Sequence, residues 1–108
     1  MTNVQGQLVR DANNVPCGYS SANITAAAPT TTVVKSGSGI LHSITFNKPV
    51  ATGVLTIYDN TAGSGTVIGT ITTPASPMPV TVTYDLVFST GLTIVSATAA
   101  QDVTVTYI

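Results

Sequence analysis

This sequence predicts an all-β fold, for three reasons. Charged residues make up only 6% of the 108 residues, against about 25% in typical soluble domains. These are too few to form the solvent-exposed face of a surface helix. Threonine, serine, valine and alanine are abundant instead, and threonine and valine fit a pleated strand better than a helix. From residue 31 onward, apolar and polar residues alternate in runs separated by Gly-, Pro- and Ser-rich turns. We therefore expect a single antiparallel β-sandwich or jelly-roll-like barrel of about seven strands, with an irregular N-terminal arm.

The first 30 residues lack this alternation. Their few apolar residues are scattered among Asn, Gln and Gly, and the segments 13–14 (NN) and 16–18 (PCG) are turn signals. One short strand is expected near residues 7–10, and arms of this kind often become ordered only against a neighbour. The expected organisation is an arm over residues 1–30 and one sandwich domain over residues 31–108, because a chain of this length suffices for one domain.

Alternating runs define the expected strands. In the run 40–47, for example, Ile40, His42, Ile44 and Phe46 are expected on one face and the intervening residues on the other. Prolines at positions 74, 77 and 79 exclude a ladder strand between them. In chain order, the expected strands are residues 31–35, 40–47, 53–59, 66–72, 80–88, 92–96 and 102–108.

The expected core consists of apolar residues on the inward faces of these runs. Two sheets that face each other bury one face of each strand, so every second residue of a run contributes to the core. The residues expected to be buried are Ile44, Phe46, Leu55, Ile57, Val82, Tyr84, Leu86, Phe88, Leu92, Ile94, Val103 and Val105.

No catalytic, cofactor-binding or metal-binding residue is assigned from the sequence. His42 is the only histidine, and as a general base it would need an orienting carboxylate and a nucleophile. Asp59, Asp85 and Ser43 are the candidates, but no motif spacing joins them to His42. We interpret His42 as a residue on a sheet face or at a contact between subunits.

Cys17 and the four aspartates also lack the pattern of a reactive or metal-binding site. Cys17 is the only cysteine, so it cannot form an intrachain disulfide, and no basic residue is closer in sequence than Arg10 to activate its thiol. The aspartates at 11, 59, 85 and 102 are dispersed, without the spacing of a calcium loop. Asp59 ends a strand just before Asn60, where a short polar side chain can accept hydrogen bonds from a turn backbone.

The charge balance restricts the possible partners. A net charge of −1 is too small to attract nucleic acid or an anionic membrane surface, and no segment is long enough to span a bilayer. The chain begins with Met1 and residues 2–15 contain no signal-peptide core, so we expect synthesis in the cytoplasm. A β surface with so few charges is poorly protected against association, which favours its burial in an oligomer or a lattice.

Residues 39–71 carry a distinctive pattern, in which GILHSI is followed by GVLTIYDN, a Gly/Ser loop and GTVIGTI. Together with FSTGLTIV at 88–95 and DVTVTY at 102–107, this pattern resembles small β proteins encoded among the head genes of tailed bacteriophages. The resemblance implies a virion component, either a capsid decoration (cement) protein or a head- or tail-fibre attachment domain. It also implies homotrimers on the outer capsid surface. It assigns no catalytic residue and does not cover the first 38 residues.

Two functions from different classes follow as expectations. The leading one is a structural virion protein, a capsid decoration protein that binds the major capsid protein lattice as a homotrimer and stabilises the phage head through multivalent contacts. The alternative is a receptor- or carbohydrate-binding, adhesin-type β module of a head or tail fibre, which should carry exposed aromatic or acidic residues on its loops. An enzyme is not expected, because no acid–base pair is evident. The protein would be made in the host cytoplasm and lie on the capsid surface, with no cofactor, nucleic acid or membrane partner.

Overall fold

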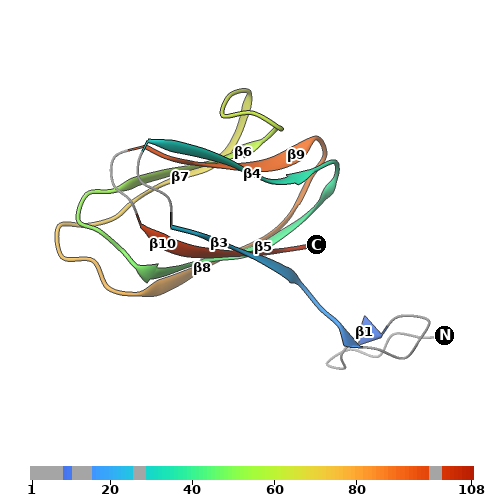
Figure 1. Cartoon of the computed structure of the whole chain (residues 1–108), viewed down its shortest axis with the longest axis horizontal. Coiled ribbons are helices and arrows are strands. Elements are labelled where there is room, and N and C mark those ends of the chain that lie inside the picture. The colour runs from blue at the N-terminus through green and yellow to red at the C-terminus, as the bar shows by residue number, and fades with distance from the viewer. Residues whose placement is uncertain (1–8, 11–15, 26–28, 98–100) are drawn as a thin grey trace.

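The computed structural model describes residues 9–10, 16–25, 29–97 and 101–108. Within these residues the regular structure is entirely β-strand, and β3 to β10 form two four-stranded antiparallel sheets packed face to face (Figure 1). The predicted all-β sandwich is therefore confirmed. The strands are β1 (Val9–Arg10), β2 (Pro16–Cys17), β3 (Ser20–Ile24), β4 (Thr30–Ser36), β5 (Gly39–Lys48), β6 (Val54–Asp59), β7 (Thr66–Thr72), β8 (Val80–Phe88), β9 (Gly91–Ser96) and β10 (Asp102–Tyr107).

The strand order is that of a jelly roll. One sheet, called here the β5 sheet, has the order β3-β10-β5-β8, and the other, the β6 sheet, has the order β4-β9-β6-β7. Along the chain, β6 pairs with β7, β5 with β8, β4 with β9 and β3 with β10, as in one long hairpin whose tip lies between β6 and β7. When this hairpin is rolled up, β10 also pairs with β5 and β9 with β6, which closes the two sheets over one core.

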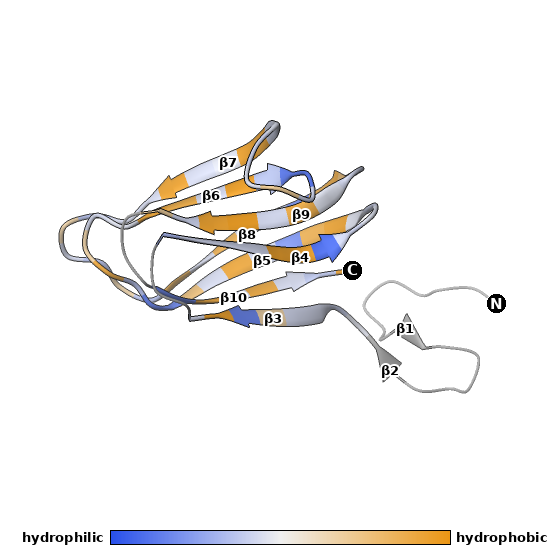
Figure 2. Ribbon diagram, turned by 45° about the horizontal axis from the view of Figure 1, so that its top comes forward, coloured by the Kyte–Doolittle hydropathy of each residue, from blue (hydrophilic) through white to orange (hydrophobic). Residues whose placement is uncertain are grey.

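The core between the sheets contains the residues that the alternation predicts. Figure 2 shows hydrophobic and paler bands alternating along the strands. Of the predicted core residues, Val82, Tyr84 and Leu86 are only partly buried, because their strand β8 lies at an edge of its sheet; the others are buried. Ile24 and Leu41 are also buried, and the sequence pattern did not indicate either of them.

Strand β5 departs from the predicted alternation at His42. Leu41 is buried in the core, whereas Ile40 is 37% exposed and His42 is half-buried. The prediction that Ile40 and His42 share the inward face with Phe46 is therefore wrong. The cause is a β-bulge, because the register shifts between Leu41 and Ser43 against both neighbouring strands, and such a shift moves residues to the opposite face.

The N-terminal region contains one strand more than the sequence predicts. β3 lies within the range 1–30 predicted to be irregular, yet it pairs with β10 and completes the β5 sheet, so the sandwich has eight strands. Its sequence, SSANI, has little β-propensity, and the strand is held by its ladder with β10 and by Ile24, which is 5% exposed. β1, which falls in the short strand expected near residues 7–10, pairs with β2 beyond the end of the sandwich (Figures 1 and 2).

Candidate functional site

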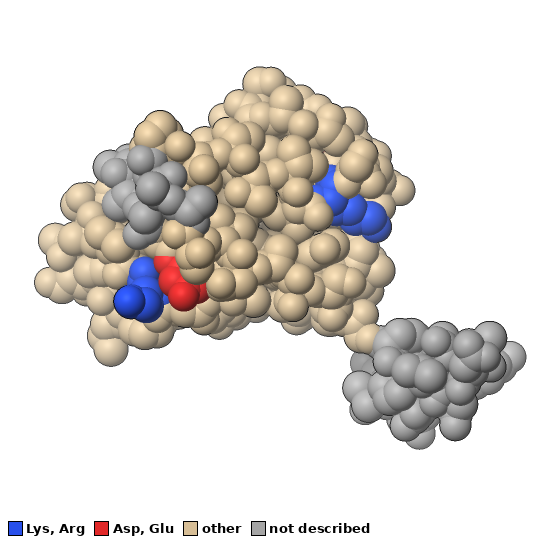
Figure 3. All heavy atoms as spheres, viewed as in Figure 1, with Lys and Arg blue, Asp and Glu red and all other residues tan. Residues whose placement is uncertain are grey.

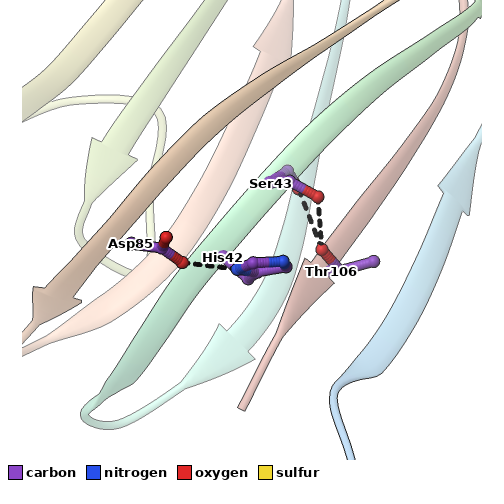
Figure 4. A network of polar contacts seen from close by, with 4 residues as sticks. All are labelled: His42, Ser43, Asp85 and Thr106. Atoms are coloured by element: carbon purple, nitrogen blue, oxygen red, sulfur yellow. Dashed lines mark hydrogen bonds and ion pairs between the residues drawn. The ribbon is translucent and has the colours of Figure 1, made fainter. Parts of the chain in front are cut away.

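A β-bulge brings His42 and Asp85 together on the outer face of the β5 sheet. Where β5 has His42 between two paired residues, β8 has both Tyr84 and Asp85. The Asp85 backbone has a φ of +49°, a left-handed conformation that residues other than glycine adopt only rarely. The His42 Nδ1–H donates a hydrogen bond to Asp85 Oδ1 (Figure 4). The bulge thus aims the carboxylate at the imidazole, as bulges beside functional sites often do.

Tyr19 stacks on the His42 ring. The two ring centroids are 4.1 Å apart and the ring planes differ by 8°. Tyr19 directly precedes β3, so this stack fixes the place where the N-terminal segment leaves the sandwich. The side chain of Tyr19 nevertheless remains 48% exposed. His42 therefore lies on a sheet face, as the sequence indicates, between an aromatic ring and a carboxylate.

Ser43 does not complete a catalytic triad in this geometry. Its hydroxyl lies 2.6 Å from the Thr106 hydroxyl on β10, and Figure 4 shows it pointing toward that residue. No hydrogen bond joins Ser43 to His42 in the part of the chain that the structure describes. Asp59, the other carboxylate considered, lies elsewhere and binds the backbone of residues 89–91. The cluster thus offers an oriented imidazole, an aromatic ring and a carboxylate for hydrogen bonding and stacking.

Hydroxyl and amide side chains cover the rest of this outer face. The strand registers place them in two rows that cross all four strands of the β5 sheet. Neighbours bond across the ladders, as Thr45 Oγ1 does with Thr81 Oγ1 at 2.9 Å, so many of these groups are satisfied within the sheet. The row nearer His42 contains Ser21, Thr106, Ser43 and Thr83, and the next contains Asn23, Thr104, Thr45 and Thr81.

On the other side of His42, four apolar side chains form a row across the same sheet. Ile40 N donates to Ile108 O at 3.1 Å and Ile108 N donates to Ile40 O at 2.9 Å, so these two residues are direct neighbours. Val87 is the partner of Ile40 on β8, and the β3 register continues the row with Tyr19. Val87 is 72% exposed and Ile108 is 50% exposed. Tyr19, Ile108, Ile40 and Val87 are called here the apolar row.

The outer face of the β6 sheet, in contrast, is partly covered by its own chain. The loop between β6 and β7 folds back over it, so that Thr93 Oγ1 donates to Asn60 O at 2.6 Å. A Cβ atom on Gly63 of this loop would lie 2.9 Å from a methyl carbon of Val95 on the same face. Thr93 is consequently fully buried, whereas Val67 on the edge strand β7 is 50% exposed.

Asp59 has a structural role at the end of β6. It accepts backbone hydrogen bonds from Ser89 N at 3.0 Å, Thr90 N at 2.8 Å and Gly91 N at 3.4 Å. The bond from Ser89, followed by the one from Thr90, lowers the pKa of Asp59 below its ordinary value of 3.8. The predicted turn role of Asp59 is thus confirmed, but the turn it holds is the distant one between β8 and β9.

Acid should weaken the fold through two aspartates, Asp59 and Asp102. The pKa of Asp102 is lowered by hydrogen bonds that the side-chain amides of Asn23 and Asn47 donate to it. Because both pKa values are lower in the folded chain, their contribution to stability is complete above about pH 5 and is lost as the pH falls through the folded pKa. We expect the urea midpoint, measured by circular dichroism, to fall steeply below about pH 4. Asp59→Asn should lower the midpoint at pH 7 and make this acid dependence shallower. An unchanged acid slope in Asp59→Asn would contradict the prediction.

The remaining candidate residues are not assembled into a site. Cys17 lies in β2, but its side chain is outside the described residues, and so is Asp11. In residues 9–10, 16–25, 29–97 and 101–108, no three His, Cys, Asp or Glu side chains converge in a way that could hold a metal ion. The same residues contain no apolar helix of membrane-spanning length.

Comparison with protein-family models, with curated proteins and with solved structures finds no match to this chain. The resemblance to phage head proteins accordingly stays a prediction. The function is inferred below from the two surface features described above, the scarcity of charge and the cluster around His42.

Proposed function

We propose that this chain is a structural virion protein and not an enzyme. Its role is that of a capsid decoration (cement) protein, which binds the major capsid protein lattice of a tailed-bacteriophage head as a homotrimer and stabilises it. Each copy contributes a modest contact, and linking the copies raises the effective concentration of the second and third contacts. The protein is made in the host cytoplasm and resides on the capsid surface.

The observation that carries this proposal is the scarcity of charge on a closed β-sandwich. On the face of the sandwich shown in Figure 3, the charged side chains lie toward opposite ends, and the described surface between them carries no charged residue. The carboxylates of Asp59 and Asp85 are held within the chain, by a turn backbone and by His42. A surface with so few charges protects a free monomer poorly from association. Burying it against a partner costs little free energy of desolvation, because few charged groups lose their hydration.

The fold is compatible with both expected functions. Jelly rolls occur in viral capsid domains and in lectins, and a fold alone does not decide function. The hydroxyl rows add polar groups that are largely bonded to each other, so covering them leaves few unsatisfied donors and acceptors. These properties favour a broad protein contact and support the decoration role.

A receptor- or carbohydrate-binding module remains the second candidate, because the exposed Tyr19 ring stacks on His42 beside Asp85. An aromatic ring next to a carboxylate is a common arrangement for holding a sugar, which stacks on the ring and donates hydroxyl hydrogen bonds to the carboxylate. This cluster is small, however, and it lies on a sheet face instead of on loops. Binding of soluble oligosaccharides that Tyr19→Ala abolishes would favour this candidate over the first.

The proposal is tested by the mass of the native particle and by its location. Light scattering should give about three times the chain mass of 11.0 kDa, and mass spectrometry of purified virions should find the chain in many copies per particle. A stable monomer at micromolar concentration, together with its absence from virions, would overturn the proposal.

A further inference from the structure

We propose that the loop between β7 and β8, residues 73–79 (TPASPMP), is the part of this chain that inserts into its partner protein, with Met78 as the anchor. This segment is called here the proline loop. The partner is the major capsid protein lattice, which receives the Met78 side chain in an uncharged apolar pocket. The inference rests on the proposed decoration function, and it adds which surface of the chain meets the lattice and the chemistry of the site that receives it.

The proline loop leaves the sandwich from a fixed base. Its first residue, Thr73, is 5% exposed, and its hydroxyl accepts a hydrogen bond from Gly53 N at 2.8 Å. The backbone adds two more bonds, from Thr73 N to Gly53 O at 2.9 Å and from Thr52 N to Pro74 O at 3.3 Å. These bonds join the loop to the neighbouring loop between β5 and β6, at the end of the sandwich away from β1 (Figure 1). The start of the proline loop is therefore held in place before any partner binds.

Beyond this base, the loop exposes a large apolar side chain on a stiff backbone. Pro74, Pro77 and Pro79 each have a fixed φ angle, so the loop has little conformational freedom to lose on binding. Met78 lies between two of these prolines and is 76% exposed, more than any other large apolar side chain that the structure describes. An unbranched thioether fits pockets of irregular shape, which suits Met78 to the role of an anchor.

The backbone of the loop can be covered by a partner at low cost. Prolines lack the backbone N–H, so burying them leaves no unsatisfied donor at these positions. The other residues of the exposed part are Ala75, Ser76 and Met78, and no described residue accepts a hydrogen bond from their N–H groups. These three donors are therefore available to carbonyl groups of the partner.

The surroundings of the loop carry little charge. Residues 60–84, which include all of β7 and most of β8, contain no charged residue and no histidine. The β5–β8 register pairs Phe46 with Val80, so the charged residue that it places toward the loop is Lys48, at the end of β5. Lys48 is in turn the partner of Asp102, which has the opposite charge, in the β5–β10 register. An uncharged apolar pocket can therefore receive Met78 without isolating a charge that has no counterpart.

The test measures binding of the full chain to phage heads assembled without it, by co-sedimentation of a labelled chain with the heads. Met78→Asp removes the anchor and places a carboxylate where the pocket is apolar. Val33→Asp is the matched control, because Val33 is also an exposed apolar residue, at 49%, but lies on β4, at the opposite edge of the β6 sheet from β7. Circular dichroism and sedimentation equilibrium check that both variants keep the fold and the oligomeric state of the wild type.

We expect Met78→Asp to raise the apparent dissociation constant for the heads by about 10-fold or more, because each linked subunit loses a buried apolar side chain. Val33→Asp should change this constant by about twofold or less. Wild-type binding by Met78→Asp, or an equal loss in both variants, would overturn the inference. Dissociation of the oligomer by Met78→Asp would also overturn it, because the loop would then join copies of this chain.

The wild-type chain separates this inference from the proposed function. If the wild type does not bind the heads at all, the decoration role itself is wrong. If the wild type binds and Met78→Asp binds equally well, the decoration role stands and only the assignment of the proline loop fails.

Discussion

Phe46→Ala should lower the free energy of unfolding by about 3–5 kcal/mol. Phe46 is fully buried, and its strand neighbours Val103 and Val80 belong to the strands on either side of β5. Alanine would leave a cavity between the sheets that the ladders on both sides of β5 prevent from collapsing. A typical domain is stable by about 5–15 kcal/mol, so this loss is a large fraction of the total.

The measurement is urea unfolding at pH 7, followed by circular dichroism. Met78→Ala serves as the control, because Met78 is 76% exposed and its truncation should change the stability by about 0.5 kcal/mol or less. Both proteins must be compared at the same subunit concentration, since assembly stabilises the folded state by mass action. A loss of less than about 1 kcal/mol for Phe46→Ala would show that the sandwich core can repack.

Among substitutions of glycine by alanine, Gly39→Ala should lower the stability of the fold the most. A Cβ atom at this position would lie 2.2 Å from Ile108 O and 2.7 Å from Phe88 Cζ, far inside normal contact distances. The carbonyl of Ile108 already accepts a hydrogen bond from Ile40 N, so moving it aside breaks the bridge at the end of the β5–β10 ladder. We expect a cost of about 1–3 kcal/mol, the usual range for overpacking a filled site.

The matched control is Gly18→Ala, because a Cβ on Gly18 would meet no atom within 4 Å. Its melting temperature, measured by differential scanning calorimetry, should stay close to that of the wild type, whereas Gly39→Ala should melt several degrees lower. Equal melting temperatures for the two variants would mean that the C-terminal residue can shift at little cost. In that case Ile108 would be a mobile member of the apolar row.

The alternation of Val, Ile and Thr was sufficient to predict the strands from β4 to β10 and most of the core, because a strand with one buried face has a period of two. The sequence did not predict β3, because SSANI contributes a single buried apolar side chain, Ile24. This strand is held in place by its pairing with β10. The alternation of apolar and polar residues also could not distinguish a simple sandwich from a jelly roll, which differ in strand order. Strand order is set by pairings between residues far apart in sequence, such as Val103 with Ile24.

The candidate site was less predictable than the fold. Nothing in the spacing of His42 and Asp85 links them, because their contact depends on bulges in two neighbouring strands. A bulge changes no residue type, and the alternation in the run 80–88 continues through Asp85 without interruption. One signal was available for Asp59: a carboxylate at a strand end tends to bind a turn backbone. Even there, its actual partner, Ser89, lies 30 residues away.

The position of β10 has a consequence for how the protein is made. The last strand of the chain is an inner strand, inserted between β3 and β5. Asn23 and Asp102, which bond across this ladder, are 79 residues apart, so the β5 sheet cannot close until the segment that forms β10 has left the ribosome. Until β10 emerges, β3 and β5 therefore present open edges to each other and to neighbouring nascent chains, and long-range pairings of this kind form slowly. Synthesis of β10 is thus the step that permits this sheet to close, and a chain that lacks β10 keeps both edges open to aggregation.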